Sequence, residues 1–537
     1  MFKLLSVQIS KLKMQMVQFV AVMVILGTIN IALPYLSGLY IDKLVNVTLI
    51  EQVATLFVAI AVIYFLQIIL KYVQVYVSTK LGNEMSYRIC NDVFQKIFHS
   101  DYKQYSNIDL AHYVDQIKKD STTIVRFFLS NVVNFVLQIT TIVASALMII
   151  KADVLLSVII FMLLPFYIIT FKLNRKSIYI ARKESAVKAN EYFSRSAEQI
   201  YKLLYVQQNV LDAEMETRLN DAYLKHSKAA LEAVKTEYVF TNLNQMIITL
   251  AYLCIIGVGG YKVIVGDLTI GYFSIINNYF GMIIHSISYF LGLAGTYQES
   301  KIASERLNAI FAGKEDMNGQ MTVSTISKID IKNLSVKYQD VEVLQNANYS
   351  FAAGKIYGIQ GKNGKGKSTL LNAILNIYAG EHSGEVQYDG IPVNELDMLT
   401  IRRKHISYLE QNPVQFNMPV KDYLTFGIDD YSEEILQNLI HCFKIEYLMD
   451  SRMNDSGTTF SGGEKQKLAL IRTLSKKSSI ILLDEPTSAL DQESISLLIN
   501  SLNKIKKDMI IILVSHDMRI LSECDEIIVL EDKEGDC

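Results

Sequence analysis

The stretch Gly361-Lys362-Asn363-Gly364-Lys365-Gly366-Lys367-Ser368-Thr369 decides the fold of the second half of the chain. It follows a β-rich run at Lys355–Gln360 and opens a helical run from Ser368 to Tyr378. A glycine-rich loop in this position lets backbone N–H groups surround phosphate oxygens, and the helix dipole adds to the attraction. The sequence therefore predicts a phosphate-binding loop, with Lys367 as its cation and Ser368 as a ligand for Mg²⁺. The residues expected to bind the nucleotide here are Gly361, Asn363, Gly364, Gly366, Lys367, Ser368 and Thr369.

The first half of the chain has the composition of a membrane protein. Half of the 537 residues are hydrophobic, and six apolar runs are long enough to cross the bilayer, for which a helix needs roughly 20 residues. Lys71 interrupts the second run and Pro165 lies in the fourth, where neighbouring helices can satisfy the freed carbonyl. The sequence predicts an all-α domain of six transmembrane helices. The runs are Met16–Tyr40, Gln52–Val75, Phe127–Ile150, Val154–Phe171, Phe240–Val265 and Tyr272–Gly295.

Basic residues predict the orientation of these helices. Two long connections carry Lys and Arg close to the apolar runs, for example Arg88 and Arg126 in one and Arg175 and Arg182 in the other. Because basic residues are retained in the cytoplasm, both long connections and both termini are expected there. Residues 1–13 resemble an interfacial helix and not a signal peptide. The chain is thus expected to be a multi-pass protein of the cytoplasmic membrane, in contact with lipid, and its composition favours a bacterial source.

Helical spacing continues through both long connections, which predicts that the membrane helices extend far into the cytoplasm. Near Asp101–Leu110 and Gln199–Val206 the charge pattern breaks and tyrosines appear. Short transverse helices that touch a partner domain are expected at these two places.

A polar stretch separates the two halves. The predicted domains are a transmembrane domain at 1–311, a linker at 312–327 and an α/β domain at 328–537, in which short β-branched runs alternate with helical segments. The net charge of only -2 gives no reason to expect a nucleic-acid partner, and the five cysteines lack metal-ligand spacing. Neither a zinc site nor a disulfide framework is indicated.

Further motifs follow the phosphate loop in a fixed order. Asp484 ends a buried apolar run and suits a ligand of Mg²⁺, while the adjacent Glu485 can polarise a water for attack on the γ-phosphate. His516 ends another apolar run and can hydrogen-bond the γ-phosphate. Gln411 follows a third apolar run, and its side chain is expected to reach Mg²⁺ and the attacking water. The remaining predicted nucleotide contacts are Tyr338, which would stack on the adenine, together with Ser461, Gly462, Gly463 and Asp491.

These motifs together resemble those of an ATP-binding cassette transporter of the exporter type, with one membrane domain fused ahead of one ATPase domain that includes a helical subdomain. The resemblance implies that two copies pair head to tail, with ATP held between Lys367 of one copy and Ser461-Gly462-Gly463 of the other. It also implies that the two transverse helices are coupling helices, the second reaching the partner's ATPase domain. Since no motif is degenerate, a homodimer is expected, with ATP and Mg²⁺ as cofactors.

The sequence departs from the family pattern at two points. Where the family signature usually reads Leu-Ser-Gly-Gly-Gln, Phe460 and Glu464 occupy the ends. The glycines that face phosphate are kept, and a carboxylate in the first turn suits the helix dipole, so activity is expected to survive. Asp455-Ser456-Gly457 stands where exporters tend to carry Glu-x-Gly.

Polar residues recur within the apolar runs and predict a path for the cargo. Such residues usually face a bundle interior or a water-filled cavity, although small and amide side chains also join helices directly. An amide-rich wall with little fixed charge apart from His285 would suit the backbone of a peptide and bind anionic head groups poorly. The candidate path residues are Asn131, Asn134, Gln138, Asn242, Gln245, Ser274, Asn278, His285 and Ser288.

The favoured function is ATP-driven export of a peptide or a similar amphipathic compound by alternating access. A lipid flippase or a multidrug exporter is the alternative within the same class. An ATP-gated regulatory or channel-like protein is the alternative of another class, and import on an exporter-like fold also stays open. The presence of Glu485 and His516 favours a pump.

Overall fold

The computed structural model describes residues 2–46, 50–105, 110–313, 318–338, 341–362, 364–378, 381–454 and 460–530. The chain forms two compact units. We call Met1–Val93 with Val114–Ala309 the helical unit, and Phe94–Tyr113 with Ile310–Cys537 the sheet unit. The sequence placed 94–113 in the membrane domain, whereas in the structure these residues cluster with the sheet unit.

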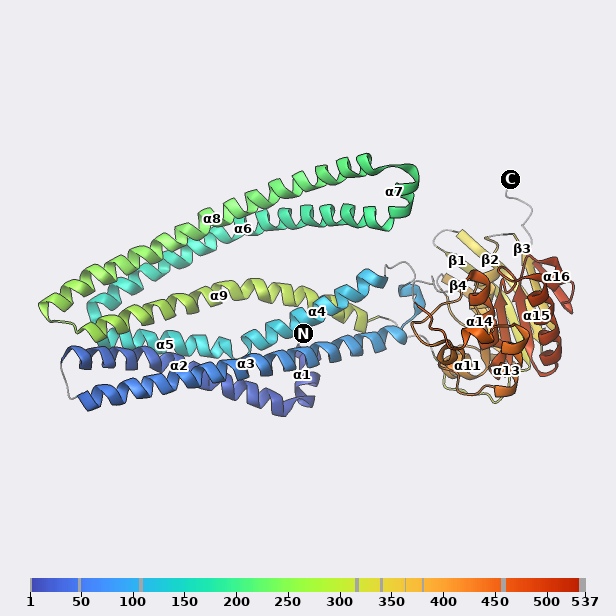
Figure 1. Ribbon diagram of the computed structural model, residues 1–537, viewed down its shortest axis with the longest axis horizontal. Helices are drawn as coiled ribbons and strands as arrows, with labels where there is room; N and C mark the ends of the chain where they lie inside the picture. Colours follow the sequence, from blue (N-terminus) through green and yellow to red (C-terminus); the bar gives the residue numbers. More distant parts are fainter. Residues whose placement is uncertain are drawn as a thin grey trace. The chain divides into compact units, whose positions relative to one another are not determined.

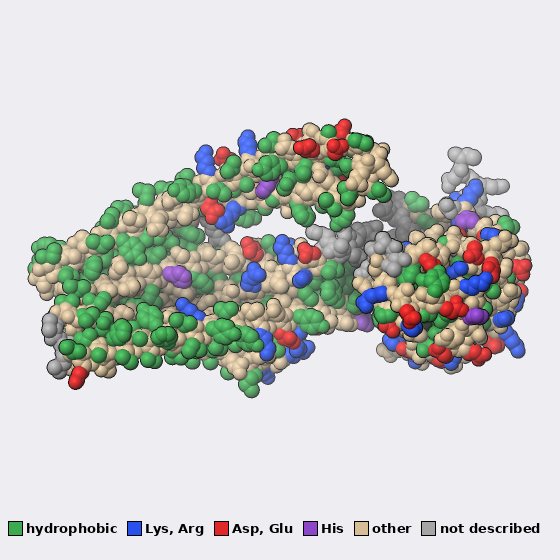
Figure 2. Space-filling model, viewed as in Figure 1, with side chains coloured by type: hydrophobic (Ala, Val, Ile, Leu, Met, Phe, Trp, Pro, Cys, Tyr) green, Lys and Arg blue, Asp and Glu red, His purple; other side chains and the backbone are tan. Residues whose placement is uncertain are grey.

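The helical unit is built from very long helices (Figure 1). α6 continues without interruption through Pro165 and far past its apolar part, and α8 packs along it, as the predicted cytoplasmic extensions require. Hydrophobic side chains cover much of the visible face of these helices (Figure 2). The bounds are α1 Phe2–Lys11, α2 Lys13–Val45, α3 Ile50–Phe98, α4 Leu110–Asn131, α5 Asn134–Ala152, α6 Val154–Tyr201, α7 Leu203–Asn209, α8 Asp212–Val265 and α9 Ile270–Phe311.

Within the described residues, five segments are long and apolar enough to cross a membrane, so the predicted count of six is not confirmed by this criterion. The missing one is α9, which forms a continuous helix but carries Asn277, Asn278 and His285 inside its apolar part. These polar side chains lower its hydropathy. The five segments are Lys13–Val45, Ile50–Phe98, Tyr113–Ala152, Val154–Tyr201 and Asp212–Val265.

Polar and close backbone contacts fix α9 among its neighbours. At its start, the Gly271 N–H donates to Asp42 Oδ1 (2.6 Å), and a Cβ at Gly271 would lie only 2.1 Å from the Gly38 carbonyl oxygen. Only glycine therefore allows α2 and α9 to approach this closely. Farther along, Arg306 binds the buried Asp120 of α4 through two hydrogen bonds of 2.5 and 2.7 Å.

The third apolar run, which was predicted as one helix, is interrupted between α4 and α5 at Val132–Val133. The Ser130 carbonyl, which would accept a backbone N–H in a continuous helix, accepts Asn134 Nδ2 instead (2.7 Å). Amide side chains can satisfy carbonyls that a helix break leaves open. Asn134 therefore contributes to the backbone of the break.

The sheet unit contains two sheets. A four-stranded antiparallel sheet has the order β2-β1-β4-β5, and a five-stranded parallel sheet has the order β6-β7-β8-β3-β9. The sequence predicted the parallel sheet, while the antiparallel one is an addition. The strands are β1 Lys328–Tyr338, β2 Val341–Ala352, β3 Ile356–Gly361, β4 Glu381–Tyr388, β5 Ile391–Pro392, β6 Ile406–Leu409, β7 Ile480–Asp484, β8 Ile510–Val514 and β9 Glu526–Leu530.

Helices cover the parallel sheet and form the predicted helical subdomain. α12, α13 and α14 pack together over one cluster of buried apolar residues, while α10 packs against β3 and β7. The helices are α10 Lys367–Ile374, α11 Met398–Lys404, α12 Val420–Thr425, α13 Glu433–Cys442, α14 Gly462–Ser475, α15 Gln492–Ile505 and α16 Met518–Leu521. Three short 3₁₀ turns are η1 Tyr102–Gln104, η2 Glu446–Leu448 and η3 Lys506–Asp508.

The described part of the predicted linker, residues 318–327, is attached to the sheet unit. Met321 bridges Leu396 in parallel, and the N–H groups of Gly319 and Met321 donate to the carbonyls of Leu396 and Glu395. Ile326 is buried in the apolar core of the sheet unit. This segment is therefore part of the folded unit and not a loose connection.

Candidate functional site

The phosphate loop lies at the carboxyl end of β3, the strand between β8 and β9. Gly364 and Gly366 have φ angles of 84° and 85°, in the left-handed region that favours glycine. Gly366 is also the N-cap of α10 and has no side chain to bind the first N–H groups of the helix. These N–H groups and the positive end of the helix dipole form a cradle suited to phosphate. α10 ends at Ile374, earlier than the predicted helical run to Tyr378.

Lys367 is 8% exposed, and its ammonium lies inside the loop. Nζ donates to the carbonyls of Gly361 (2.7 Å) and Lys362 (3.2 Å) and lies 2.8 Å from His516 Nε2. An ammonium has no lone pair, so the imidazole must accept this bond through Nε2 and carry its proton on Nδ1. The structure thus joins the loop lysine to His516, which the sequence placed 149 positions away.

Ser368 and Asp484 form the second pair of the site. Ser368 Oγ donates to Asp484 Oδ2 at 2.7 Å. Asp484 is buried at the end of β7, and burial raises its pKa, an effect that the Ser368 hydroxyl and the Lys367 charge partly offset. A buried carboxylate beside a hydroxyl favours a nearby cation, because the cation would restore the charged form.

Glu485 follows Asp484 with φ 51°, which is uncommon for a residue with a side chain. Its N–H donates to the Val514 carbonyl, and its own carbonyl accepts Gln466 Nε2 at 3.4 Å. These bonds hold the strained turn. The turn places Glu485 Oε1 3.5 Å from His516 Nε2. The sequence did not predict the role of Gln466, which follows the signature glycines on α14 and looked like an ordinary helical residue.

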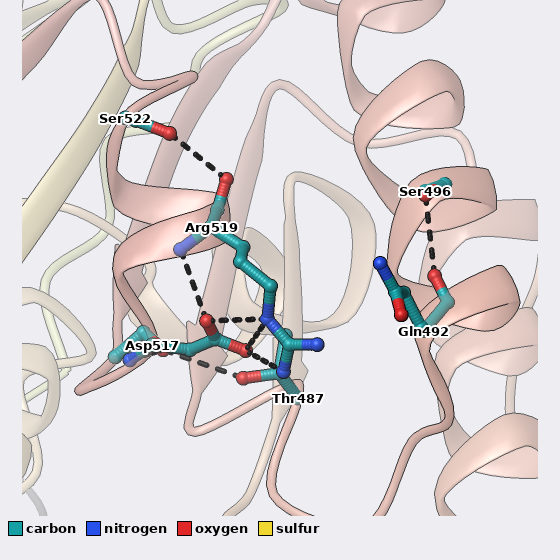
Figure 3. Close-up of polar contacts among 7 residues, drawn as sticks. Thr487, Gln492, Ser496, Asp517, Arg519 and Ser522 are labelled. Carbon is teal, nitrogen blue, oxygen red and sulfur yellow. Dashed lines mark hydrogen bonds and ion pairs between the residues drawn. The ribbon is translucent and has the colours of Figure 1, made fainter.

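An ion pair stabilises the turn that follows His516. Arg519 binds both carboxylate oxygens of Asp517, with Nη2 to Oδ2 at 2.6 Å (Figure 3), and this pairing lowers the pKa of Asp517. The Asp517 N–H donates to Ser515 Oγ (3.0 Å), which also lies 3.4 Å from Thr487 Oγ1. The turn that carries His516 is therefore tied to the turn after Glu485.

Two predicted site residues stand apart from this cluster. Gln411 is exposed beyond β6, and no hydrogen bond within the described part of the chain joins it to Ser368 or Asp484. Asp491 is the N-cap of α15, where it accepts the Ser494 N–H at 2.8 Å. It also pairs with Lys467 of α14 at 3.4 Å. Thr369 lies in the first turn of α10.

The signature residues form the start of α14. Ser461 is the N-cap and Glu464 completes a capping box: Glu464 N–H donates to Ser461 Oγ, and Ser461 N–H donates to Glu464 Oε2 (2.7 Å). Tyr447 donates a hydrogen bond to Glu464 Oε1 (2.5 Å). The bonds from Tyr447 and Ser461 lower the pKa of Glu464. A Cβ at Gly463 would lie 2.9 Å from the Ala489 carbonyl, so the residue packs closely on the segment after Glu485.

We expect Glu464→Gln to lower the stability of the protein by about 0.5–1 kcal/mol, because an amide offers one oxygen to the three donors that the carboxylate accepts and loses the favourable charge at the helix N-terminus. ATPase activity should stay within about threefold of the parent, since Ser461, Gly462 and Gly463 keep their places. Thermal unfolding and steady-state hydrolysis measure the two effects. Glu434→Gln, in the first turn of α13, removes a charge without a capping box and is the control. Equal loss of stability in both variants would contradict the capping role.

Several predicted residues lie outside the described part of the structure. These are Asn363, the departure at 455–457, residues 106–109 of the first transverse segment, and the side chain of Tyr338. Their assignments remain predictions.

A cavity of about 490 Å³ lies in the helical unit between α2, α3, α5 and α9. Four of the predicted path residues line it, from two different helices. Apolar side chains such as Met23, Leu26, Leu137 and Met282 complete the wall. The polar lining residues are Asn30, Lys71, Gln74, Asn134, Gln138, Thr141, Asn278, His285 and Ser286.

Other predicted path residues do not line this cavity. Asn131 Oδ1 accepts the Tyr289 hydroxyl (2.8 Å), and Ser288 Oγ lies 2.7 Å from the Tyr167 hydroxyl, so both join α9 to neighbouring helices. Asn242 binds the carbonyl of Tyr238 within its own helix. Ser274 accepts Asn278 Nδ2 through its carbonyl oxygen, and Gln245 also lies away from the lining residues. Helical spacing shows which side chains share one face of a helix, but it does not show whether that face contacts another helix or the cavity.

Five polar lining residues were not among the predicted path residues, and Lys71 is the one that carries a full positive charge. It was treated only as an interruption of the second apolar run, and the cavity was expected to carry little charge apart from His285. The structure places the Lys71 side chain in the cavity wall. The available signal was the isolated cation itself, because ionisable residues in membrane segments usually serve a function.

Two family models match the chain. One, described as ABC transporter, matches residues 344–488, and one, described as ABC transporter transmembrane region, matches residues 16–287. Relatives described as putative multidrug export ATP-binding/permease proteins are 25% identical in Staphylococcus aureus strain NCTC 8325 / PS 47 and 24% identical in strain bovine RF122 / ET3-1. Each alignment covers 95% of this chain and 92% of the relative.

The same architecture occurs in the solved structure of a bacterial Atm1-family ABC exporter with ATP bound. The TM-score is 0.80 at 18% sequence identity, over 97% of this chain and 94% of the other. The two matches place a transmembrane region ahead of a second ABC transporter region in one polypeptide. The chain therefore belongs to the ABC transporter family, as an exporter-type half-transporter whose ATPase is coupled to transport.

Proposed function

We propose that this transporter exports an amphipathic compound, which binds in the cavity between α2, α3, α5 and α9, and that it works as a homodimer. The cavity carries the proposal. Its volume of about 490 Å³ falls within the range of small-molecule sites. Its wall combines amide and hydroxyl groups with apolar side chains, which is the composition expected for a molecule with a polar and an apolar part.

The residues of the nucleotide site support Mg²⁺ as the cofactor. A serine hydroxyl and a buried aspartate, joined at 2.7 Å in Ser368 and Asp484, provide the oxygen ligands that Mg²⁺ prefers beside phosphates. When bound, the ion would neutralise charge on the phosphate oxygens. In this arrangement Lys367 binds phosphate, and Glu485 orients and deprotonates the attacking water. His516 reports on the γ-phosphate through Lys367.

Charged groups of the first transverse segment act on the segment that follows α10. Beyond α10, the Tyr378 ring stacks on His382 with centroids 3.7 Å apart. Burial lowers the pKa of His382, and the charges of Asp101 and Lys103 beside η1 act on it in opposite directions. A Cβ at Gly313 would lie 2.5 Å from Gln104 Oε1. We propose that η1 is the coupling segment and that a shift of α10 reaches it through Tyr378 and His382.

Purified alone and reconstituted in vesicles, the chain should hydrolyse ATP cooperatively and accumulate amphipathic dyes in inside-out vesicles. Cargo that fills the cavity should stimulate ATP hydrolysis. Asn278→Leu and His285→Leu should each need a higher cargo concentration than the parent for half-maximal stimulation. Loss of one polar partner that the cargo needs costs about 1–3 kcal/mol, or about tenfold in half-maximal concentration. Gln245→Leu, outside the cavity, is the control.

Each alternative predicts a different result from these vesicles. Stimulation by short peptides and not by dyes would identify a peptide exporter. Stimulation by lipid alone would favour a flippase. Activity that returns only with a second, different subunit would exclude the homodimer, and ATP-dependent ion conductance without accumulation of cargo would favour the channel-like alternative.

A further inference from the structure

Lys71 lies on a polar face of α3 that is directed toward α2. Gln67, Lys71 and Gln74 follow one another at helical spacing. Gln67 Nε2 donates to Asn30 Oδ1 of α2 at 2.6 Å, and Gln74 Nε2 lies 2.9 Å from Met23 Sδ. Because residues before and after Lys71 both contact α2, the side chain between them belongs to the same face and lines the cavity.

The charge of Lys71 is not balanced by the cavity wall. No Asp or Glu occurs among the residues that line it. Among the described residues, no hydrogen bond or ion pair joins Lys71 to another side chain. Cations within membrane segments are costly unless they pair with an anion or contact water, so this position requires a reason beyond packing.

The depth of Lys71 agrees with that of the other polar lining residues. At 1.5 Å per residue, Lys71 lies about 31 Å along α3 from Ile50. By the same rise, Asn134 lies about 27 Å from Ala152 and Asn30 about 22 Å from Val45, which are the ends of α5 and α2 on the same side of the membrane. These side chains therefore lie nearer to the long connections than to the short ones, on the side from which cargo enters an exporter.

We propose that the exported compound carries an anionic group, a carboxylate or a phosphate, that pairs with Lys71 in this cavity. Gln74, Asn278 and His285 bind the remaining polar groups, and Leu26 and Leu137 contact the apolar part. This assignment rests on the proposed export function and names the chemical class of its cargo. It reverses the expectation, drawn from the sequence, that the cavity binds anionic groups poorly.

The test compares two probes that differ only in their terminal group: N-lauroylglycine, with a charged carboxylate, and N-lauroylglycinamide, with a neutral amide. Both are added to the reconstituted full-length protein in phosphatidylcholine vesicles, and ATPase stimulation and uptake are measured relative to the basal rate of each variant. For the parent, the half-maximal concentration of the acid should be about tenfold lower than that of the amide, the effect of one charge-assisted hydrogen bond. Lys71→Gln should abolish this difference, and Lys71→Arg should retain most of it.

Lys80→Gln is the matched control, because Lys80 is an exposed lysine on the same helix beyond the cavity. The Lys80→Gln variant should prefer the acid over the amide as strongly as the parent does. A further comparison replaces the probe by phosphatidylglycerol in the vesicles. Stimulation of ATPase activity by that lipid, lost in Lys71→Gln, would support the proposal and identify a lipid head group as the anion. Stimulation by the acyl amino acid alone would support the proposal and identify a free amphiphile as the cargo.

Two results would overturn the proposal. One is equal stimulation by acid and amide in the parent, and the other is an unchanged preference in Lys71→Gln, which would mean that the ammonium only extends toward the membrane surface. Both leave the export function intact as long as either probe is transported. A parent that accumulates neither these probes nor the amphipathic dyes would instead overturn the export function itself, and the cargo assignment with it.

Discussion

Glu485→Gln should lower ATP hydrolysis by at least about 100-fold while nucleotide binding stays intact, because an amide has the shape of the carboxylate but cannot accept a proton from water. The backbone bonds from Glu485 to Val514 and from Gln466 involve no side-chain atom of Glu485. The positive φ of the turn is no harder for glutamine than for glutamate. The variant should therefore fold normally and accumulate as a dimer with ATP bound.

Single-turnover hydrolysis and nucleotide retention measure this effect. Glu493→Gln is the control, because Glu493 is an exposed glutamate on α15 that pairs with Lys444 and lies outside the site. Turnover of Glu485→Gln within about threefold of the parent would remove Glu485 from the role of general base.

The second large effect is expected for Lys367→Met, which should weaken ATP binding by about 10–100-fold, the range for lost hydrogen bonds to a charged group. Methionine fills a similar volume in this buried position but cannot donate to phosphate. Equilibrium titration with a fluorescent ATP analogue measures the affinity. Because the carbonyls of Gly361 and Lys362 also lose a donor, thermal unfolding must be measured alongside.

Lys355→Met provides the comparison for this substitution, since Lys355 precedes β3 and its ammonium forms an exposed ion pair with Glu526 at 3.5 Å. The control should bind ATP like the parent. An equal loss of ATP affinity in both variants would show that the effect comes from the overall charge of the protein. The assignment of Lys367 as a phosphate contact would then be wrong.

The sequence could propose a nucleotide site because each of its parts is local. A loop between a strand and a helix, or a carboxylate at the end of a buried strand, is recognisable within about ten residues. Parallel strands bring their carboxyl ends to one edge of the sheet, so Lys367, Asp484 and His516 meet once the strand order is known. The bond between Lys367 and His516 and the support from Gln466 depend on side-chain directions that no pattern contains.

The membrane path was harder to predict, because helical spacing identifies a face but not its neighbour. Asn131 and Asn278 have the same residue type, yet one joins two helices and the other lines the cavity. The break at Val132–Val133 follows no proline or glycine. Lys71 was visible in the sequence, but the direction of its side chain depends on how α2 and α3 pack together.

The attachment of residues 318–327 to the sheet unit determines where the ATPase unit can be cut from the chain. A fragment that begins at Lys328, the start of β1, would lose the backbone bonds of Gly319 and Met321 and expose the pocket that Ile326 fills. Any larger residue at position 319 would have its Cβ about 2 Å from the Glu395 backbone. The N-terminal edge of the ATPase domain therefore lies ahead of its first strand, and an ATPase fragment should keep Gly319 as native sequence with any added tag placed upstream of it.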